Sequence, residues 1–118
     1  MDDQTTKTSR IAEQNDRFRQ EGASQTLQGY LIVTQGISAL PYPTVQAILA
    51  RVMAFDDFSE DNDPHGEHDF GAFDVDQAGK VFWKIDYYAG DELEFGSDDP
   101  SDPAQTFRVL TIMLASEY

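Results

Sequence analysis

The chain has 118 residues, a formal net charge of −14 at pH 7 and no cysteine. This length is typical of one domain, and a hydrophobic content of 40% is enough for a core, which excludes an acidic disordered tail. The lack of cysteine excludes disulfides, thiolate catalysis and cysteine-bound metal clusters. No apolar stretch is typical of a signal peptide or a membrane span, so we expect a cytoplasmic protein without membrane attachment.

The net negative charge comes entirely from the second half of the chain. In residues 1–54 five acidic residues balance five basic ones, so residues 55–118 carry the whole −14. Two segments without Lys or Arg contribute most of it, and we name residues 56–69 the first acidic loop and residues 91–102 the second acidic loop. Such charge repels nucleic acid and anionic lipid, so we predict no direct binding to either and expect the basic surface of a protein as the partner.

The first half of the chain predicts two helices and one strand. Residues 1–8 are predicted to form a flexible N-terminal tail, and residues 9–118 a single α+β domain that begins with a helix over 9–21. The β-branched and aromatic segment 29–34 predicts a strand with little exposure on either face. Apolar side chains then recur with helical spacing from Val45 to Met53, which predicts an amphipathic helix.

The second half predicts a hairpin after the first acidic loop. Segments 70–75 and 80–88 are typical of strands, and Gly79 suits the left-handed position of the short turn between them. In the second of these strands alternate residues share one face, because side chains point to opposite sides of a sheet. The residues that we assign to the core are Val81, Trp83, Ile85 and Tyr87.

The end of the chain predicts a short strand at 93–95 and a buried C-terminal helix. Asp102 as N-cap, Pro103 in the first helical position and Gln105 form a capping-box arrangement, and a nearly continuous apolar run follows. The predicted order is α-β-α-β-β-(β)-α. We therefore expect an α+β fold, with a small antiparallel sheet of three to four strands packed against two or three helices.

Several blocks of the sequence resemble a small bacterial domain family of unknown function. They are NDRFRQ, EDNDPHGEHDFGAFDV, VFWKIDYY, LEFGSDDP and RVLTIMLASEY. The resemblance covers residues 11–118 and implies a bacterial protein. It implies no activity, cofactor or catalytic residue, so it assigns a role to no residue of this chain.

Both histidines of the chain lie close together in the first acidic loop. His65, His68 and Asp69 offer imidazole and carboxylate ligands that suit zinc, manganese or iron, with Asp86 or Glu94 as supporting carboxylates. Hard oxygen ligands in the same loop also suit calcium. The alternative is a polar turn in which one histidine is hydrogen-bonded to a carboxylate. No nucleophile–base pair and no phosphate-binding loop is recognisable, so we predict no catalytic residue and no cofactor.

Two interpretations of the acidic loops remain open. High net charge keeps a protein soluble, and this function alone would explain them. The hypothesis we favour is a non-enzymatic acidic interaction protein, whose carboxylates mimic nucleic-acid phosphates and inhibit a DNA-binding complex such as a CRISPR or restriction system. A metal-binding protein or metal-dependent enzyme centred on His65, His68 and Asp69 is the alternative. The predicted partner-binding residues are Asp56, Asp57, Glu60, Asp61, Asp63, Glu67, Asp91, Glu92, Glu94, Asp98, Asp99 and Asp102.

Overall fold

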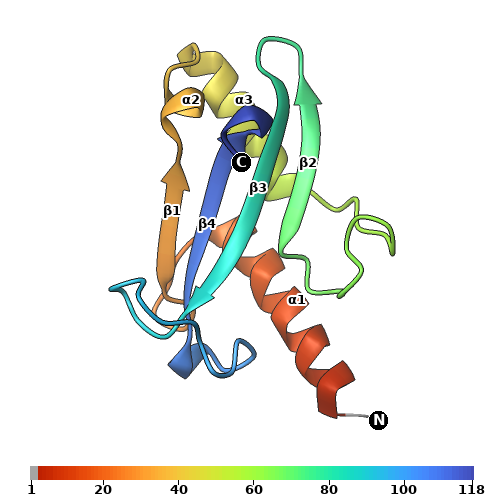
Figure 1. Ribbon diagram of the computed structural model, residues 1–118, viewed down its shortest axis with the longest axis vertical. Helices are drawn as coiled ribbons and strands as arrows, with labels where there is room; N and C mark the ends of the chain where they lie inside the picture. Colours follow the sequence, from red (N-terminus) through yellow and green to blue (C-terminus); the bar gives the residue numbers. More distant parts are fainter. Residues whose placement is uncertain (1–2) are drawn as a thin grey trace.

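A four-stranded mixed sheet forms the centre of the molecule (Figure 1). The structure is a computed structural model that describes residues 3–118. The strands are β1 (Gly29–Val33), β2 (Phe70–Val75), β3 (Gly79–Tyr88) and β4 (Phe107–Leu114), and their order in the sheet is β1-β4-β3-β2. β1 runs parallel to β4, whereas the β4–β3 and β3–β2 pairs are antiparallel. The predicted α+β class is confirmed, and the sheet is mixed rather than antiparallel.

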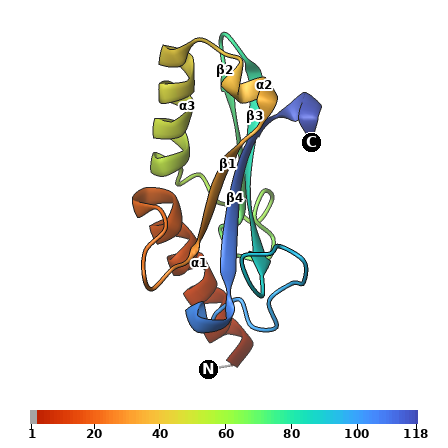
Figure 2. The same cartoon turned by 90° about the vertical axis from the view of Figure 1, so that its left-hand side faces the viewer.

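Three helices accompany the sheet: α1 (Asp3–Glu21), α2 (Gln35–Ser38) and α3 (Tyr42–Ala54). Figure 2 shows α1 and α3 on the same face of the sheet, with the C-terminus on the other side. Within residues 3–118, no helix is long and apolar enough to cross a membrane.

The core lies between this face of the sheet and the two long helices. The alternation predicted for β3 is confirmed for Val81, Trp83 and Ile85, which are buried while the side chains between them are only partly covered. Tyr87, which was also assigned to the core, is only partly buried and packs against it. Ile48 and Val52 of α3 pack into the same cluster. The amphipathic helix and the hairpin were predicted correctly, including the left-handed turn glycine, Gly79, with φ of 77°.

The N-terminal helix is longer than the sequence predicts. It begins at Asp3, so residues 3–8 belong to α1 rather than to a flexible tail, and residues 1–2 lie outside the described part. The added turns have little apolar surface of their own. They are held instead by contacts with the acidic loops, including an ion pair between Lys7 Nζ and Asp99 Oδ2 at 3.7 Å. The periodicity of apolar residues in a sequence does not reveal contacts between a helix and loops that are distant in the chain.

The predicted C-terminal helix is wrong. Asp102 does cap a helical turn, since its Oδ1 accepts a hydrogen bond from the Ala104 amide at 3.0 Å, but that turn is a 3₁₀ helix over Pro103–Gln105. The apolar run that follows is β4, which pairs with β1 and β3 on its two sides. A central strand with apolar residues on both faces shows no alternation, and its pattern therefore resembles that of a buried helix.

Two smaller predictions about strands are also wrong. No strand forms over 93–95, and the next residue, Gly96, forms only an isolated bridge with Tyr88. The strand predicted at 29–34 exists as β1, but it lies at the edge of the sheet and its middle residues are exposed rather than buried.

Candidate functional site

The two acidic loops flank the first helix. The first acidic loop connects α3 to β2 and lies on the right of Figure 1, and the second follows β3 and lies at the lower left. α1 passes between them in this view, and side chains of α1 contact both. Both loops are therefore attached to one helix, although they are far apart in sequence.

Arg108, near the start of β4, is completely buried and binds the second acidic loop to α1. Its Nη2 donates to the carbonyl of Pro100 at 3.0 Å and to Oε1 of Gln14 at 2.7 Å, while its Nε donates to Oδ1 of Asn15 at 2.8 Å. Burial lowers the pKa of Arg108. Within the described side chains it makes no ion pair with a carboxylate, so neutral oxygens accept its hydrogen bonds.

Asn15 extends this network to the first acidic loop. Its Nδ2 donates to the carbonyl of Glu67 at 3.0 Å and contacts the Tyr87 hydroxyl oxygen at 2.8 Å. Tyr87 in turn donates its hydroxyl proton to Oε1 of Glu67 at 2.9 Å. Burial, together with the negative charge of Glu67, raises the pKa of Tyr87, so the phenol stays protonated. We refer to Gln14, Asn15, Glu67, Tyr87 and Arg108 as the Arg108 network.

A second group of contacts, around Asp16 and Arg19 of α1, also holds the first acidic loop and the residue before it. Arg19 is buried, donates from Nη2 to Asp16 at 2.9 Å and to the Phe55 carbonyl at 3.0 Å, and lies 4.7 Å above the Trp83 ring. Desolvation lowers the pKa of Arg19, and Asp16 opposes that effect. His68 reaches the same Asp16 through Nδ1 at 3.0 Å.

The residues predicted as metal ligands do not form a cluster. His65 is exposed, whereas His68 stacks on Phe58 at 3.9 Å and has a positive φ of 56°. Burial raises the pKa of Asp69, and the nearby Glu67 and Asp63 raise it further. Within the part of the chain that the structure describes, no three His, Asp or Glu side chains are grouped to hold a metal ion.

The two supporting carboxylates lie elsewhere. Asp86 pairs with Lys84 at 2.9 Å, on the face of the sheet opposite the core, and this hydrogen bond raises the pKa of Lys84. Glu94 is exposed in the second acidic loop.

The predicted partner-binding residues fall into two sets. Asp63, Glu67, Asp99 and Asp102 are used internally. Asp63 is buried and accepts from the His68 amide at 3.2 Å, and the Ser101 hydroxyl lowers the pKa of Asp99 by donating to it at 2.6 Å. The other set, here called the exposed acids, is solvent-accessible and makes no side-chain hydrogen bond or ion pair within the described residues. It comprises Asp56, Asp57, Glu60, Asp61, Asp91, Glu92, Glu94 and Asp98.

The Arg108 network was not predicted from the sequence. One signal was present, because Arg108 is the single charged residue in the apolar run FRVLTIML. A charged residue inside a buried element requires polar partners, and its partners here come from a distant helix and a loop. Asn15 in the middle of a helix gave no comparable signal.

Comparison with known proteins gives one match. No curated protein and no solved structure is significantly similar to this chain. The model of a family described as "Protein of unknown function (DUF3768)" matches residues 33–117, which include the two acidic loops, the last three strands and Arg108. The chain therefore belongs to the DUF3768 family.

Proposed function

We propose that this protein is a non-enzymatic acidic binding protein, which presents its acidic loops to the basic surface of a nucleic-acid-binding protein in place of nucleic acid. One observation carries the proposal. Two loops without Lys or Arg are both attached to α1 through Arg108 and Asn15, which places the two loops on the two flanks of one helix. A loop whose only role is solubility needs no such attachment.

The charge of the exposed acids is not compensated by the neighbouring cations. Arg108 is buried among neutral oxygens, Arg19 is buried against Asp16, and Lys7 pairs with Asp99. These three cations are thus used to fold the chain. The exposed acids are left to repel one another, and a basic partner would relieve that repulsion.

Attachment of the loops also favours affinity. A flexible acidic loop loses conformational entropy when a partner orders it, whereas a loop fixed beforehand loses less. The Ser101 and Asp99 contacts fix the second loop, and Asn62 fixes the first by accepting from the Ser59 amide at 2.7 Å. Carboxylates carried by such loops resemble the phosphates that basic grooves bind, and charge of this density accelerates association.

Displacement of DNA from a DNA-binding complex tests this proposal. A fluorescent duplex is bound to a purified restriction endonuclease or to a CRISPR effector complex, and anisotropy is followed as the protein is added. We expect displacement at about 50 mM salt that weakens at least tenfold by about 200 mM, because charge contacts depend steeply on salt.

A charge-matched pair of variants shows whether the loops are responsible. The first replaces four exposed acids of the first acidic loop, as Asp56→Asn, Asp57→Asn, Glu60→Gln and Asp61→Asn. The control removes the same charge elsewhere, as Glu13→Gln, Glu21→Gln, Asp74→Asn and Asp76→Asn, all exposed positions. We expect the loop variant to lose at least tenfold in displacement and the control to lose little. Equal losses, or no displacement by the unmodified protein at low salt, would contradict the proposal.

A further inference from the structure

The edge of the sheet formed by β1 lacks the protection that isolated edge strands have. Edge strands of monomeric proteins are blunted by charged side chains, proline, a bulge or a covering segment. In β1 the middle residues Tyr30, Leu31 and Ile32 are 46%, 53% and 39% exposed, and none of them is charged. Figure 2 looks onto this side of the molecule, and α1 and α3 lie beside β1 without covering it.

The absence of charge extends well beyond the strand. Between Gly22 and Ala50 the sequence has no Asp, Glu, Lys, Arg or His, although a quarter of the whole chain is charged. This segment includes β1, α2 and most of α3. Depletion of charged residues on a surface is the compositional feature that marks the core of a protein–protein interface.

The backbone of β1 leaves every second residue free to pair. Gln28 accepts from the Arg108 amide, and the Thr34 amide donates to Ile112, so the even-numbered residues face β4. Because backbone groups alternate along a strand, the N–H and C=O groups of Gly29, Leu31 and Val33 point away from the sheet.

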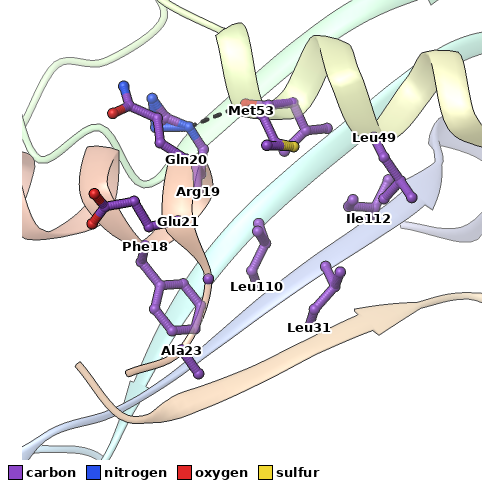
Figure 3. A pocket seen from close by; sticks show the side chains of 12 residues that line it. Phe18, Arg19, Gln20, Glu21, Ala23, Leu31, Leu49, Met53, Leu110 and Ile112 are labelled. Carbon is purple, nitrogen blue, oxygen red and sulfur yellow. Dashed lines mark hydrogen bonds between the residues drawn. The ribbon is translucent and has the colours of Figure 1, made fainter. Parts of the chain in front are cut away.

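An apolar cavity lies next to this edge. It has a volume of about 260 Å³ and is bounded by the ends of α1 and α3 and by β1 and β4. Figure 3 shows Leu31, Leu49, Met53 and Leu110 around it, with Glu21 and Gln20 nearby. Leu31 reaches it from the edge strand, so the cavity and the free backbone groups form one continuous surface.

We propose that β1 pairs with β1 of a second copy of this chain, in antiparallel orientation about a two-fold axis at Leu31. In that register Leu31 lies opposite Leu31 of the second copy, and Gly29 lies opposite its Val33. Each of these pairs joins the free backbone groups of both strands, and on the other face Tyr30 lies opposite Ile32, a stabilising aromatic and β-branched pair. The leucines meet at the mouths of the two cavities.

Self-complementarity favours a second copy as the occupant, because one two-fold axis lets the free N–H and C=O groups of both β1 strands pair at once. Two molecules of −14 repel each other over most of their surfaces, and β1, which has no charged residue, is a surface through which they can approach. The second acidic loop lies near the start of β1, where Gln28 and Asp102 line one cavity. Antiparallel pairing places the second acidic loops of the two copies at opposite ends of the shared strands, which keeps their repulsion low.

Sedimentation equilibrium of the full chain tests the proposal. We expect a dimer whose dissociation constant falls as salt rises from about 50 to 500 mM, because salt screens the repulsion between the two copies. Leu31→Lys should weaken the dimer at least tenfold, and Leu31→Pro should do the same by removing an outward-facing N–H. Phe95→Lys, which adds the same charge at a 71% exposed apolar residue in the second acidic loop, should leave the dimer intact. Circular dichroism establishes that each variant is folded.

Hydrogen exchange identifies the contact itself. The amides of Gly29, Leu31 and Val33 have no partner in β4, so only pairing with a second copy would protect them from exchange. We therefore expect them to be protected in the unmodified protein and to exchange fast in folded Leu31→Lys. A monomer at all concentrations, a dimer that survives both Leu31 substitutions, or fast exchange at these amides within a dimer would overturn the proposal. None of these results bears on whether the acidic loops bind a basic partner.

Discussion

Arg108 donates a hydrogen bond from Nε to Oδ1 of Asn15 over 2.8 Å, and both side chains are completely buried. The contact joins the start of β4 to the middle of α1 and, through the other bonds of the two residues, fixes both acidic loops. A buried guanidinium without a carboxylate loses much hydration, so every one of its acceptors contributes to keeping it in place.

Replacement of Arg108 should therefore destabilise the protein strongly. Arg108→Ala removes the donor to the buried Asn15 Oδ1 and to the partly buried oxygens of Gln14 and Pro100, and we expect the free energy of unfolding to fall by about 3 kcal/mol or more. Urea unfolding measures this change. Arg10→Ala, at an exposed position of α1, should change stability by less than about 0.5 kcal/mol. Similar small effects of both substitutions would show that the network does not stabilise the fold.

Glu117 should make stability depend on pH. Its carboxylate accepts from the Thr34 hydroxyl and from the amides of Leu114 and Gly36, and these bonds lower its pKa below the usual 4.5. A lowered pKa means that the contribution is present above pH 4.5 and disappears as pH falls through the folded value.

We therefore expect Glu117→Gln to lower Tm at pH 7, with the difference from the unmodified protein shrinking toward pH 3. Thermal unfolding monitored by circular dichroism across this range measures the effect, with Glu13→Gln as an exposed control. A difference in Tm that stays constant with pH would contradict the assigned role.

Gly71 should tolerate no side chain. A Cβ at this position would contact the Trp83 indole nitrogen and lie 2.6 Å from Trp83 Cε2 and 2.8 Å from Phe55 Cζ. Trp83 is completely buried and cannot move away, so Gly71→Ala should cost about 1–3 kcal/mol. Chemical denaturation checks this value. Gly90→Ala, where no atom lies within 4 Å, should be neutral, and equal stability of the two variants would show that the core yields at Gly71.

The exposed acids should weaken the fold at low salt. Their carboxylates repel one another without nearby cations, and dissolved ions screen that repulsion. We expect the quadruple variant of Asp56, Asp57, Glu60 and Asp61 to unfold at a higher Tm than the unmodified protein at about 20 mM salt, and at nearly the same Tm at about 500 mM. A Tm difference independent of salt would indicate that these acids act through local contacts instead.

Much of the fold is predictable from local sequence patterns. The alternation of Val81, Trp83 and Ile85 identifies β3 and its core face, and the spacing of Ile48 and Val52 identifies α3. These elements have one buried face each, and a single buried face produces a clear period in the sequence. The acidic loops are recognisable for a related reason, because segments rich in Asp, Gly and Pro favour neither helix nor strand.

The nature of β4 depends on its neighbours rather than on its own sequence. Val109 and Met113 on one face are as deeply buried as Leu110 and Ile112 on the other, so the run has no period. It is a strand because β1 and β3 supply hydrogen bonds on both sides. β1 is exposed because it pairs with β4 on one side only, so its other edge is open to solvent.

The sequence by itself determined the charge of this protein, its α+β class, its amphipathic helix, its hairpin and the positions of its two acidic loops. Only the tertiary structure decided which acids are exposed and which are held internally, because partners such as Tyr87 for Glu67 and Lys7 for Asp99 lie far from them in the chain. The periods of helices and strands record which side chains face a core. They contain no information on which buried polar groups become partners across the fold, and those contacts attach the acidic loops to α1.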